Sequence, residues 1–136
     1  MFSLINFDLK LKHKFPKKEK LIHKKRFDFL FSEGKSLKSH PIQAIYLSLE
    51  MPCFADFQVS SHSEVAFAVP KRHFKKAVDR NKIKRRMREA FRLNKRKLKG
   101  NFIIIFIYKS CSYSDYIMVE KSIIHLLEKI NEKALS

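Results

Sequence analysis

The sequence predicts an α+β fold in which a small mixed β-sheet of about four strands packs with three helices, in the order αβββαβα. Two patterns carry this prediction: three segments repeat apolar residues at three- and four-residue spacing, and short β-prone runs lie between them. The 136 residues suit one domain, in which residues 15–136 form the folded part and residues 1–14 form a flexible basic arm.

Composition narrows the classes of partner. Hydrophobic residues make up 45% of the chain, which indicates a packed globule, and the formal net charge of +17 makes nucleic acid the leading partner. A membrane surface has little support, because the longest apolar run, Phe102–Tyr108, is far shorter than a membrane span. No signal-peptide core stands at the amino end, so we expect a cytoplasmic protein with no membrane partner and no obligate protein partner.

The residue types that usually carry catalysis or bind metals are scattered. Cys53 and Cys111 stand far apart, the six His do not cluster, and the acids are spread thinly. A protein nuclease would need clustered carboxylates for metal ions or a histidine pair for acid and base work. We therefore expect no catalytic residue and no metal or other cofactor bound by the protein alone.

The first half of the chain predicts one helix and three strands. A helix is expected over Lys24–Ser32, with Glu33 and Gly34 at its end. Its residues in helical phase are Leu21, Phe27, Leu30 and Phe31. Strands are expected over Gln43–Glu50, more weakly over Phe57–Val59, and over Glu64–Val69, where Pro70 ends a buried run.

The second half predicts a helix, a strand and a helix. The first helix begins between Phe74 and Asp79 and ends at Asn94 or Gly100. Phe102–Tyr108 is expected as an interior strand that is buried on both faces. The last helix, Asp115–Ala134, turns an apolar stripe to the sheet and its acids outward. The stripe comprises Ile117, Ile123, Ile124, Leu127 and Ile130, and the acids are Glu120, Glu128 and Glu132.

The segment Lys71–Lys99 holds 15 of the 30 Lys and Arg residues and only two acids, Asp79 and Glu89. One helical stripe is apolar, formed by Ile83, Met87, Ala90 and Phe91, and an arc opposite it is expected to carry Asn81, Lys84, Arg85, Arg88 and Arg92. Like charges at such spacing repel by a few tenths of a kcal/mol each. A solvated helix would normally intersperse acids, so this segment predicts contact with a polyanion.

The order of residues in this segment resembles the RNR signature of the protein subunit of bacterial ribonuclease P. The matching residues are Lys76, Ala77, Val78, Arg80, Asn81, Lys84, Arg85, Arg88 and Glu89. The preceding Phe67–Arg72 is similar to the strand that leads into that signature, and the resemblance covers roughly residues 15–130. It implies a ribosomal protein S5 domain 2-like fold with a left-handed βαβ crossover, where general rules favour a right-handed one.

The resemblance also implies a function. The chain would be the non-catalytic protein subunit of ribonuclease P, with the ribonuclease P RNA and its Mg²⁺ removing the 5′ leader of precursor tRNA. Docking on that RNA is assigned to Lys76, Arg80, Asn81, Lys84, Arg85, Arg88 and Arg92. Contact with the leader is assigned to Phe27, Phe31, Lys71 and Arg72.

Three features of the implied site stay open from the sequence. Phe27 and Phe31, ahead of Gly34 and Ser36, fit a leader cleft and a protein core equally well. The position aligned with a further aromatic contact is Ile45, and Tyr46 would point to the opposite face of its strand. Lys75 stands where most relatives have Gly, so the turn before the basic helix has no assigned geometry.

Two other functions compete with this one. A ribosomal or general RNA-chaperone protein with no processing role would show a similar basic helix, and a helix that reads the major groove of double-stranded DNA is a third possibility. Reconstitution with a ribonuclease P RNA separates them, because only the first function accelerates leader removal.

Overall fold

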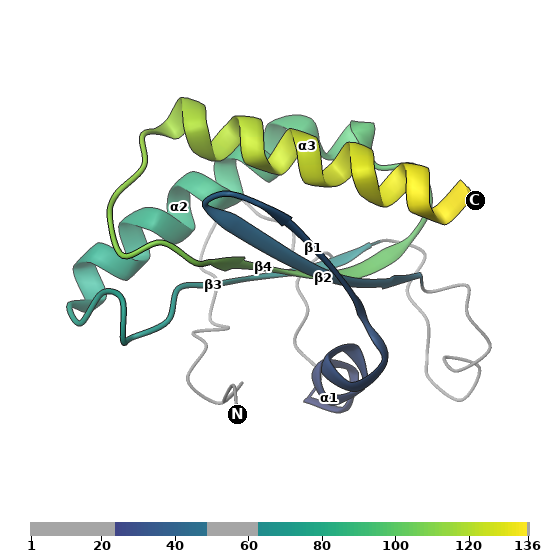
Figure 1. The fold of residues 1–136 in the computed structure, drawn as a ribbon, viewed down its shortest axis with the longest axis horizontal. Coiled ribbons are helices and arrows are strands. Elements are labelled where there is room, and N and C mark those ends of the chain that lie inside the picture. The colour runs from purple at the N-terminus through teal and green to yellow at the C-terminus, as the bar shows by residue number, and fades with distance from the viewer. Residues whose placement is uncertain (1–23, 49–62, 136) are drawn as a thin grey trace.

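The structure, a computed structural model, describes residues 24–48 and 63–135. Its elements are α1 (Lys24–Glu33), β1 (Lys35–Ser39), β2 (Ile42–Ser48), β3 (Glu64–Ala68), α2 (Ala77–Asn94), the short 3₁₀ helix η4 (Lys95–Lys97), β4 (Phe102–Tyr108) and α3 (Tyr116–Leu135). Figure 1 shows them in place. The predicted order αβββαβα is confirmed, with η4 as an addition.

The four strands form one mixed sheet in the order β1-β2-β4-β3. β1 pairs antiparallel with β2, β2 pairs antiparallel with β4, and β3 runs parallel to β4. β4 therefore lies in the interior of the sheet, and all seven of its residues are buried. This burial confirms the prediction for Phe102–Tyr108 and explains why the run has no polar alternation.

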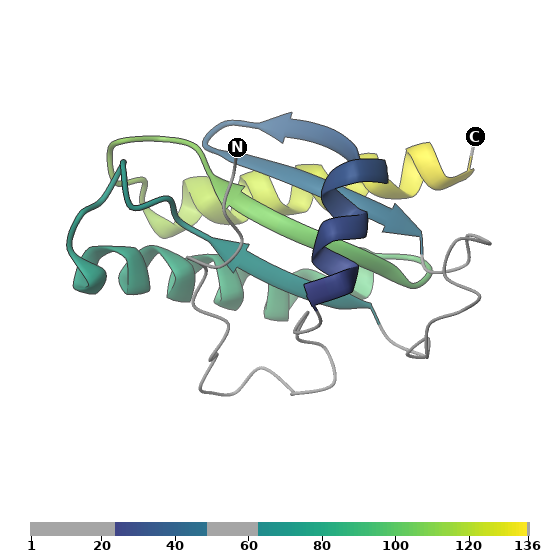
Figure 2. The ribbon, with the colours of Figure 1, turned by 90° about the horizontal axis from the view of Figure 1, so that it is seen from below.

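Helices cover both faces of the sheet. α2 and α3 lie on one face and α1 crosses the other, as Figures 1 and 2 show. An aromatic trio joins α2 to the sheet: the Phe67 and Phe106 rings stack with centroids 5.7 Å apart, and Phe91 meets them at 6.1 and 6.0 Å. The larger core lies between the sheet and the α2–α3 layer.

The connection from β3 through α2 to β4 has the hand that the family resemblance implied. In Figure 2, β3 and β4 both run from right to left, and α2 returns behind the sheet while β4 lies above β3. This arrangement is a left-handed crossover. It carries the basic helix past the edge strand β3, so one side of α2 faces away from the rest of the sheet.

β1 was not predicted from the sequence, and one predicted strand lies outside the described residues. β1, with the sequence KSLKS, has two exposed lysines and only one apolar residue, and its backbone pairing with β2 defines it as a strand. The predicted strand Phe57–Val59 and the arm over residues 1–14 lie outside the described residues. β2 begins one residue earlier than predicted, at Ile42.

The stripe predicted for the last helix needs one correction. The buried residues of α3 are Val119, Ser122, Ile123, Leu126, Leu127 and Ile130. Ile117 is 62% exposed, because it precedes Val119 by two residues and therefore lies about 160° away from it around the helix. In the part of the chain that the structure describes, no helix has the length and apolar character needed to cross a membrane.

Candidate nucleic-acid interface

α2 is anchored to the core along one stripe. Ile83, Met87, Ala90 and Phe91 are at most 1% exposed, and Asp79 places a carboxylate in the first turn, where the helix dipole favours negative charge. The 18 residues of α2 make a helix about 27 Å long. Its remaining sides divide into two flanks, which have different neighbours.

One flank carries the exposed cations that the sequence assigned to RNA. We call the cationic flank the set Lys76, Asn81, Arg85, Arg88 and Arg92. Four of its members are exposed and Arg88 is half-buried, with its Nε atom buried. On the helix, Asn81, Arg85, Arg88 and Arg92 lie opposite the apolar stripe, since their centre is about 145° from the centre of the stripe at 100° per residue. For these four residues the side of the helix agrees with the predicted arc.

Lys84 is the one member of the predicted arc that does not belong to the exposed surface. Lys84 is only 4% exposed, whereas it was predicted among the exposed cations. Lys84 precedes Phe91 by seven residues, almost two full turns, so both lie on nearly the same line along the helix. Because Phe91 packs in the core, Lys84 is buried with it.

Arg80 is turned away from the flank toward the preceding loop. Its Nη1 donates hydrogen bonds to the carbonyl oxygens of Phe74 at 2.9 Å and Lys75 at 2.8 Å. The guanidinium therefore holds the segment 70–76 against the start of α2. The same segment carries Lys71 and Arg72, both exposed, beyond the end of β3.

Arg92 carries its own counter-charge. Its guanidinium forms an ion pair with the Glu89 carboxylate, and each side chain is 40% exposed. The hydrogen bond and the charge of Glu89 raise the pKa of Arg92. A phosphate that contacts Arg92 competes with Glu89, so this position contributes less attraction than Arg85.

The opposite flank of α2 is occupied by the loop that leads into α3. Lys82 Nζ lies 5.6 Å and Arg86 Cζ lies 5.8 Å from the centre of the Tyr113 ring, and Arg86 Nη1 donates a hydrogen bond of 2.5 Å to the Ser114 carbonyl oxygen. A hydrogen bond to the Asp79 carboxylate raises the pKa of Tyr113. These contacts hold the loop on the helix.

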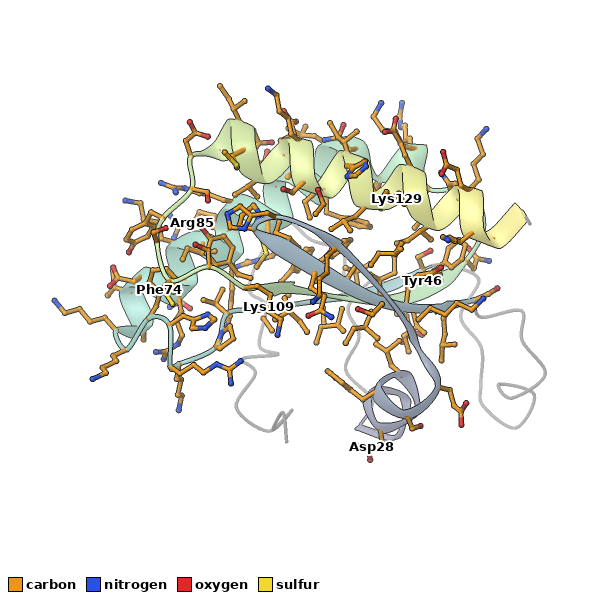
Figure 3. All side chains as sticks on the ribbon, viewed as in Figure 1. Asp28, Tyr46, Phe74, Arg85, Lys109 and Lys129 are labelled. Carbon is orange, nitrogen blue, oxygen red and sulfur yellow. The ribbon has the colours of Figure 1, made fainter. Side chains whose placement is uncertain are left out.

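The predicted leader residues lie on the α1 side and at the end of β3. Phe31 is half-buried, and the side chain of Phe27 lies outside the described residues. Tyr46, labelled in Figure 3, belongs to the core under α2 and α3 and meets Phe102 edge-on at 6.2 Å. Ile45 faces α1, because a Cβ atom built on Gly34 would lie 2.7 Å from its Cγ2 atom. The aligned position is therefore on the α1 face and is aliphatic.

Within residues 24–48 and 63–135, no group of three or more His, Cys, Asp or Glu side chains is arranged to hold a metal ion. Fold and surface together define a small basic α+β domain that presents one cationic helix flank.

Residues 15–131 match the family described as Ribonuclease P, and the chain belongs to this family of ribonuclease P proteins. It is 30% identical over 130 residues to the ribonuclease P protein component of Porphyromonas gingivalis strain W83, which covers 88% of this chain and 90% of that protein. The predicted recognition of the family is confirmed.

Solved structures confirm the predicted fold class. The ribonuclease P protein from Thermotoga maritima superposes with a TM-score of 0.67 at 28% identity, over 82% of this chain and 96% of that one. The Staphylococcus aureus ribonuclease P protein shares the fold with a TM-score of 0.66 at 23% identity, over 84% and 95% of the two chains.

Membership of the family settles the role in outline. The chain is the protein subunit of ribonuclease P, an endoribonuclease of tRNA 5′ processing, and the protein is not the catalyst. The enzyme of this family is RNA-based, which agrees with the positive charge of the chain.

Proposed function

We propose that the chain binds the ribonuclease P RNA through the cationic flank of α2 and thereby promotes removal of the 5′ leader of precursor tRNA. In this proposal the Mg²⁺ ions belong to the RNA, the folded unit spans residues 15–136, and the protein works in the cytoplasm beside its RNA partners. The RNA performs the chemistry, and the protein holds the RNA and its substrate together.

One observation carries the proposal: the cationic flank is the side of α2 that neither the core nor Tyr113 takes up. The Tyr113 loop engages Lys82 and Arg86, whereas Asn81 and Arg85 stay exposed. Arginine presents a planar fork of donors that matches phosphate oxygens, and the Asn81 amide adds a neutral donor beside it. Lys76, at the N-cap of α2, extends the same surface toward Lys71 and Arg72.

The leader of precursor tRNA is the second partner in the proposal. Phe27 and Phe31 of α1 would stack on unpaired bases, with Lys71 and Arg72 attracting the phosphates. Half-burial of Phe31 supports a ring that packs on the protein with one edge and leaves the other accessible. Since Ile45 supplies no aromatic ring on this face, the cleft holds bases with fewer stacking partners.

Reconstitution tests the proposed function directly. We expect the chain to accelerate leader removal by an in vitro transcribed bacterial ribonuclease P RNA at low Mg²⁺, and Arg85→Gln to reduce this effect. Lys129→Gln, which removes the same charge from α3, is the matched control and should act like the unchanged protein. RNA annealing without cleavage would instead support a general RNA chaperone.

The leader site has its own test. Phe31→Ala should weaken binding of precursor tRNA more than binding of mature tRNA, because only the precursor carries the leader. Each base lost from an aromatic stack costs about 1–3 kcal/mol. An equal loss for the two tRNAs would remove Phe31 from the leader site and assign it to packing of α1.

A further inference from the structure

The five residues that follow α2 carry four cations in a turn of defined shape. We call the basic turn residues 95–99, in which Lys95, Arg96, Lys97 and Lys99 surround a single apolar residue, Leu98. The Leu98 amide donates to the Lys95 carbonyl oxygen at 3.1 Å, and the Leu98 side chain packs against the core. The leucine therefore turns inward, whereas Arg96, Lys97 and Lys99 are exposed.

Asn131 of α3 fixes this turn with both ends of its side-chain amide. Its Nδ2 donates a hydrogen bond of 2.5 Å to the Lys97 carbonyl oxygen, and its Oδ1 accepts one of 2.8 Å from the Lys99 amide. These bonds satisfy backbone groups of the turn and engage no lysine side chain. A residue 32 positions further along the chain thus sets the shape of the turn.

Ser63, which directly precedes β3, makes a second set of hydrogen bonds, to residues just after the turn. Ser63 Oγ accepts a hydrogen bond of 2.9 Å from the Phe102 amide and donates one of 3.3 Å to the Gly100 carbonyl oxygen. Gly100 has a φ of 106°, a conformation that residues with a Cβ atom rarely adopt. Ser63 therefore holds the residues that lead from the turn into β4.

Holding several cations close together in this turn is unfavourable unless an anion neutralises their charge. Arg96, Lys97 and Lys99 are exposed, and none of the carboxylates that the structure describes forms an ion pair with them. Neighbouring like charges repel, and a short 3₁₀ helix has weak hydrogen-bond geometry of its own. The fold nevertheless holds these cations in one place, which lowers the entropy cost of binding an anion there.

The turn continues the surface that the proposed function uses. Arg96 follows Arg92 by four residues, across the end of α2 at Asn94. Arg85 and Arg96 are about 17 Å apart along the chain, counting 1.5 Å per residue in α2 and 2.0 Å per residue in the 3₁₀ helix. A few successive phosphates of one nucleic-acid strand span such a distance. One RNA backbone can therefore reach the cationic flank and the basic turn together.

We propose that the basic turn is a second phosphate-binding surface for the same structured RNA, and that Asn131 is its positioning residue. This inference rests on the proposed function. It assigns RNA contacts to Arg96, Lys97 and Lys99, which lie outside the RNR signature, and it gives α3 an indirect part in RNA binding.

The first test compares two variants of equal net charge. Arg96→Gln/Lys97→Gln removes two cations from the turn, and Lys121→Gln/Lys129→Gln removes two from α3. Binding of the in vitro transcribed ribonuclease P RNA is measured from low to moderate salt. The turn variant should lose about tenfold in affinity and show a salt slope smaller by one to two, while the α3 variant stays within about twofold. Equal losses, or no loss in either, would overturn the inference.

The second test separates positioning from general stability. Asn131→Ala should lower RNA affinity by about threefold in the unchanged chain and have no further effect in the Arg96→Gln/Lys97→Gln background. A loss that is the same in both backgrounds would show that Asn131 acts through the stability of the whole protein, and would remove it from this role.

The failure of the inference can be told from the failure of the proposed function. If the unchanged protein does not bind the RNA, the proposed function and the inference are both contradicted. If it binds and Arg85→Gln weakens it, while the turn variant behaves like the α3 variant, the proposed function stands and the basic turn is only a structural connection.

Discussion

Gly34 lies so close to Ile45 that a Cβ atom on its backbone would come within 2.7 Å of the Ile45 Cγ2 atom. The same Cβ atom would overlap the Leu30 carbonyl oxygen, which accepts a hydrogen bond of 2.8 Å from the Gly34 amide. Gly34 therefore allows α1 to end directly against β2. The contact sets the position of α1 on the face of the sheet that the leader proposal uses.

Gly34→Ala should lower the free energy of unfolding by about 1–3 kcal/mol, because the added methyl group forces the backbone of α1 away from β2. Urea denaturation measures the loss. Ile45→Ala in the Gly34→Ala background makes room on the side-chain side only, so it should restore little of the loss. A Gly34→Ala protein with unchanged stability would contradict the close approach.

Arg80 should act on the loop before α2 rather than on RNA alone. Arg80→Ala removes two hydrogen bonds from a charged donor and should cost about 1–3 kcal/mol of folding stability, measured in urea. Arg85→Ala is the matched control, since an exposed arginine should change stability by less than about 0.5 kcal/mol. Equal stability of the two variants would show that the Arg80 hydrogen bonds contribute nothing to the free energy of unfolding.

Lys84 and Arg85 are adjacent in sequence but differ in exposure. Lys84→Met should leave the salt dependence of RNA binding unchanged, because the residue is 4% exposed, whereas Arg85→Met should reduce the slope by about 0.7–0.9 for the lost phosphate contact. Circular dichroism checks that both variants fold. A slope reduced equally by both substitutions would return Lys84 to the RNA-binding surface.

The fold could be predicted where local pattern and tertiary burial agree. Phe102–Tyr108 is apolar throughout because it is covered on both faces, and α2 shows its stripe because one side packs on the sheet. β1 could not be predicted, since the KSLKS sequence lacks a hydrophobic pattern and pairing with β2 is a tertiary effect. The hand of the crossover also came only from the family resemblance.

The sequence predicts that the site is a helix surface with positive charge, but it does not predict which residues are exposed there. Helical phase alone placed Lys84 and Arg85 on one arc, and only the packing of Phe91 shows that the core reaches as far as Lys84. Helical phase placed Arg85 on the predicted arc and Arg86 off it, but nothing in the sequence shows that Tyr113 and Ser114 engage Arg86. The contacts of Asn131 were equally invisible, because they join residues far apart in the chain.

Tyr46 gives the protein a predictable sensitivity to alkali. Burial raises the pKa of its phenol above the ordinary value of about 10. Above that pH the unfolded chain releases the proton while the folded chain retains it, so the unfolded state binds fewer protons. Under linkage, the free energy of unfolding then falls as the pH rises from about 10 toward the folded-state pKa.

Tyr46→Phe should make this alkaline decline shallower, because the phenylalanine keeps the edge-on contact with Phe102 and has no proton to lose. Part of the decline should remain, since burial raises the pKa of Tyr116 and the Asp79 hydrogen bond raises that of Tyr113. Urea denaturation of both proteins at pH 8 and above pH 10 measures the difference. Parallel declines in the two proteins would mean that the Tyr46 phenol ionises as easily in the folded chain as in the unfolded one.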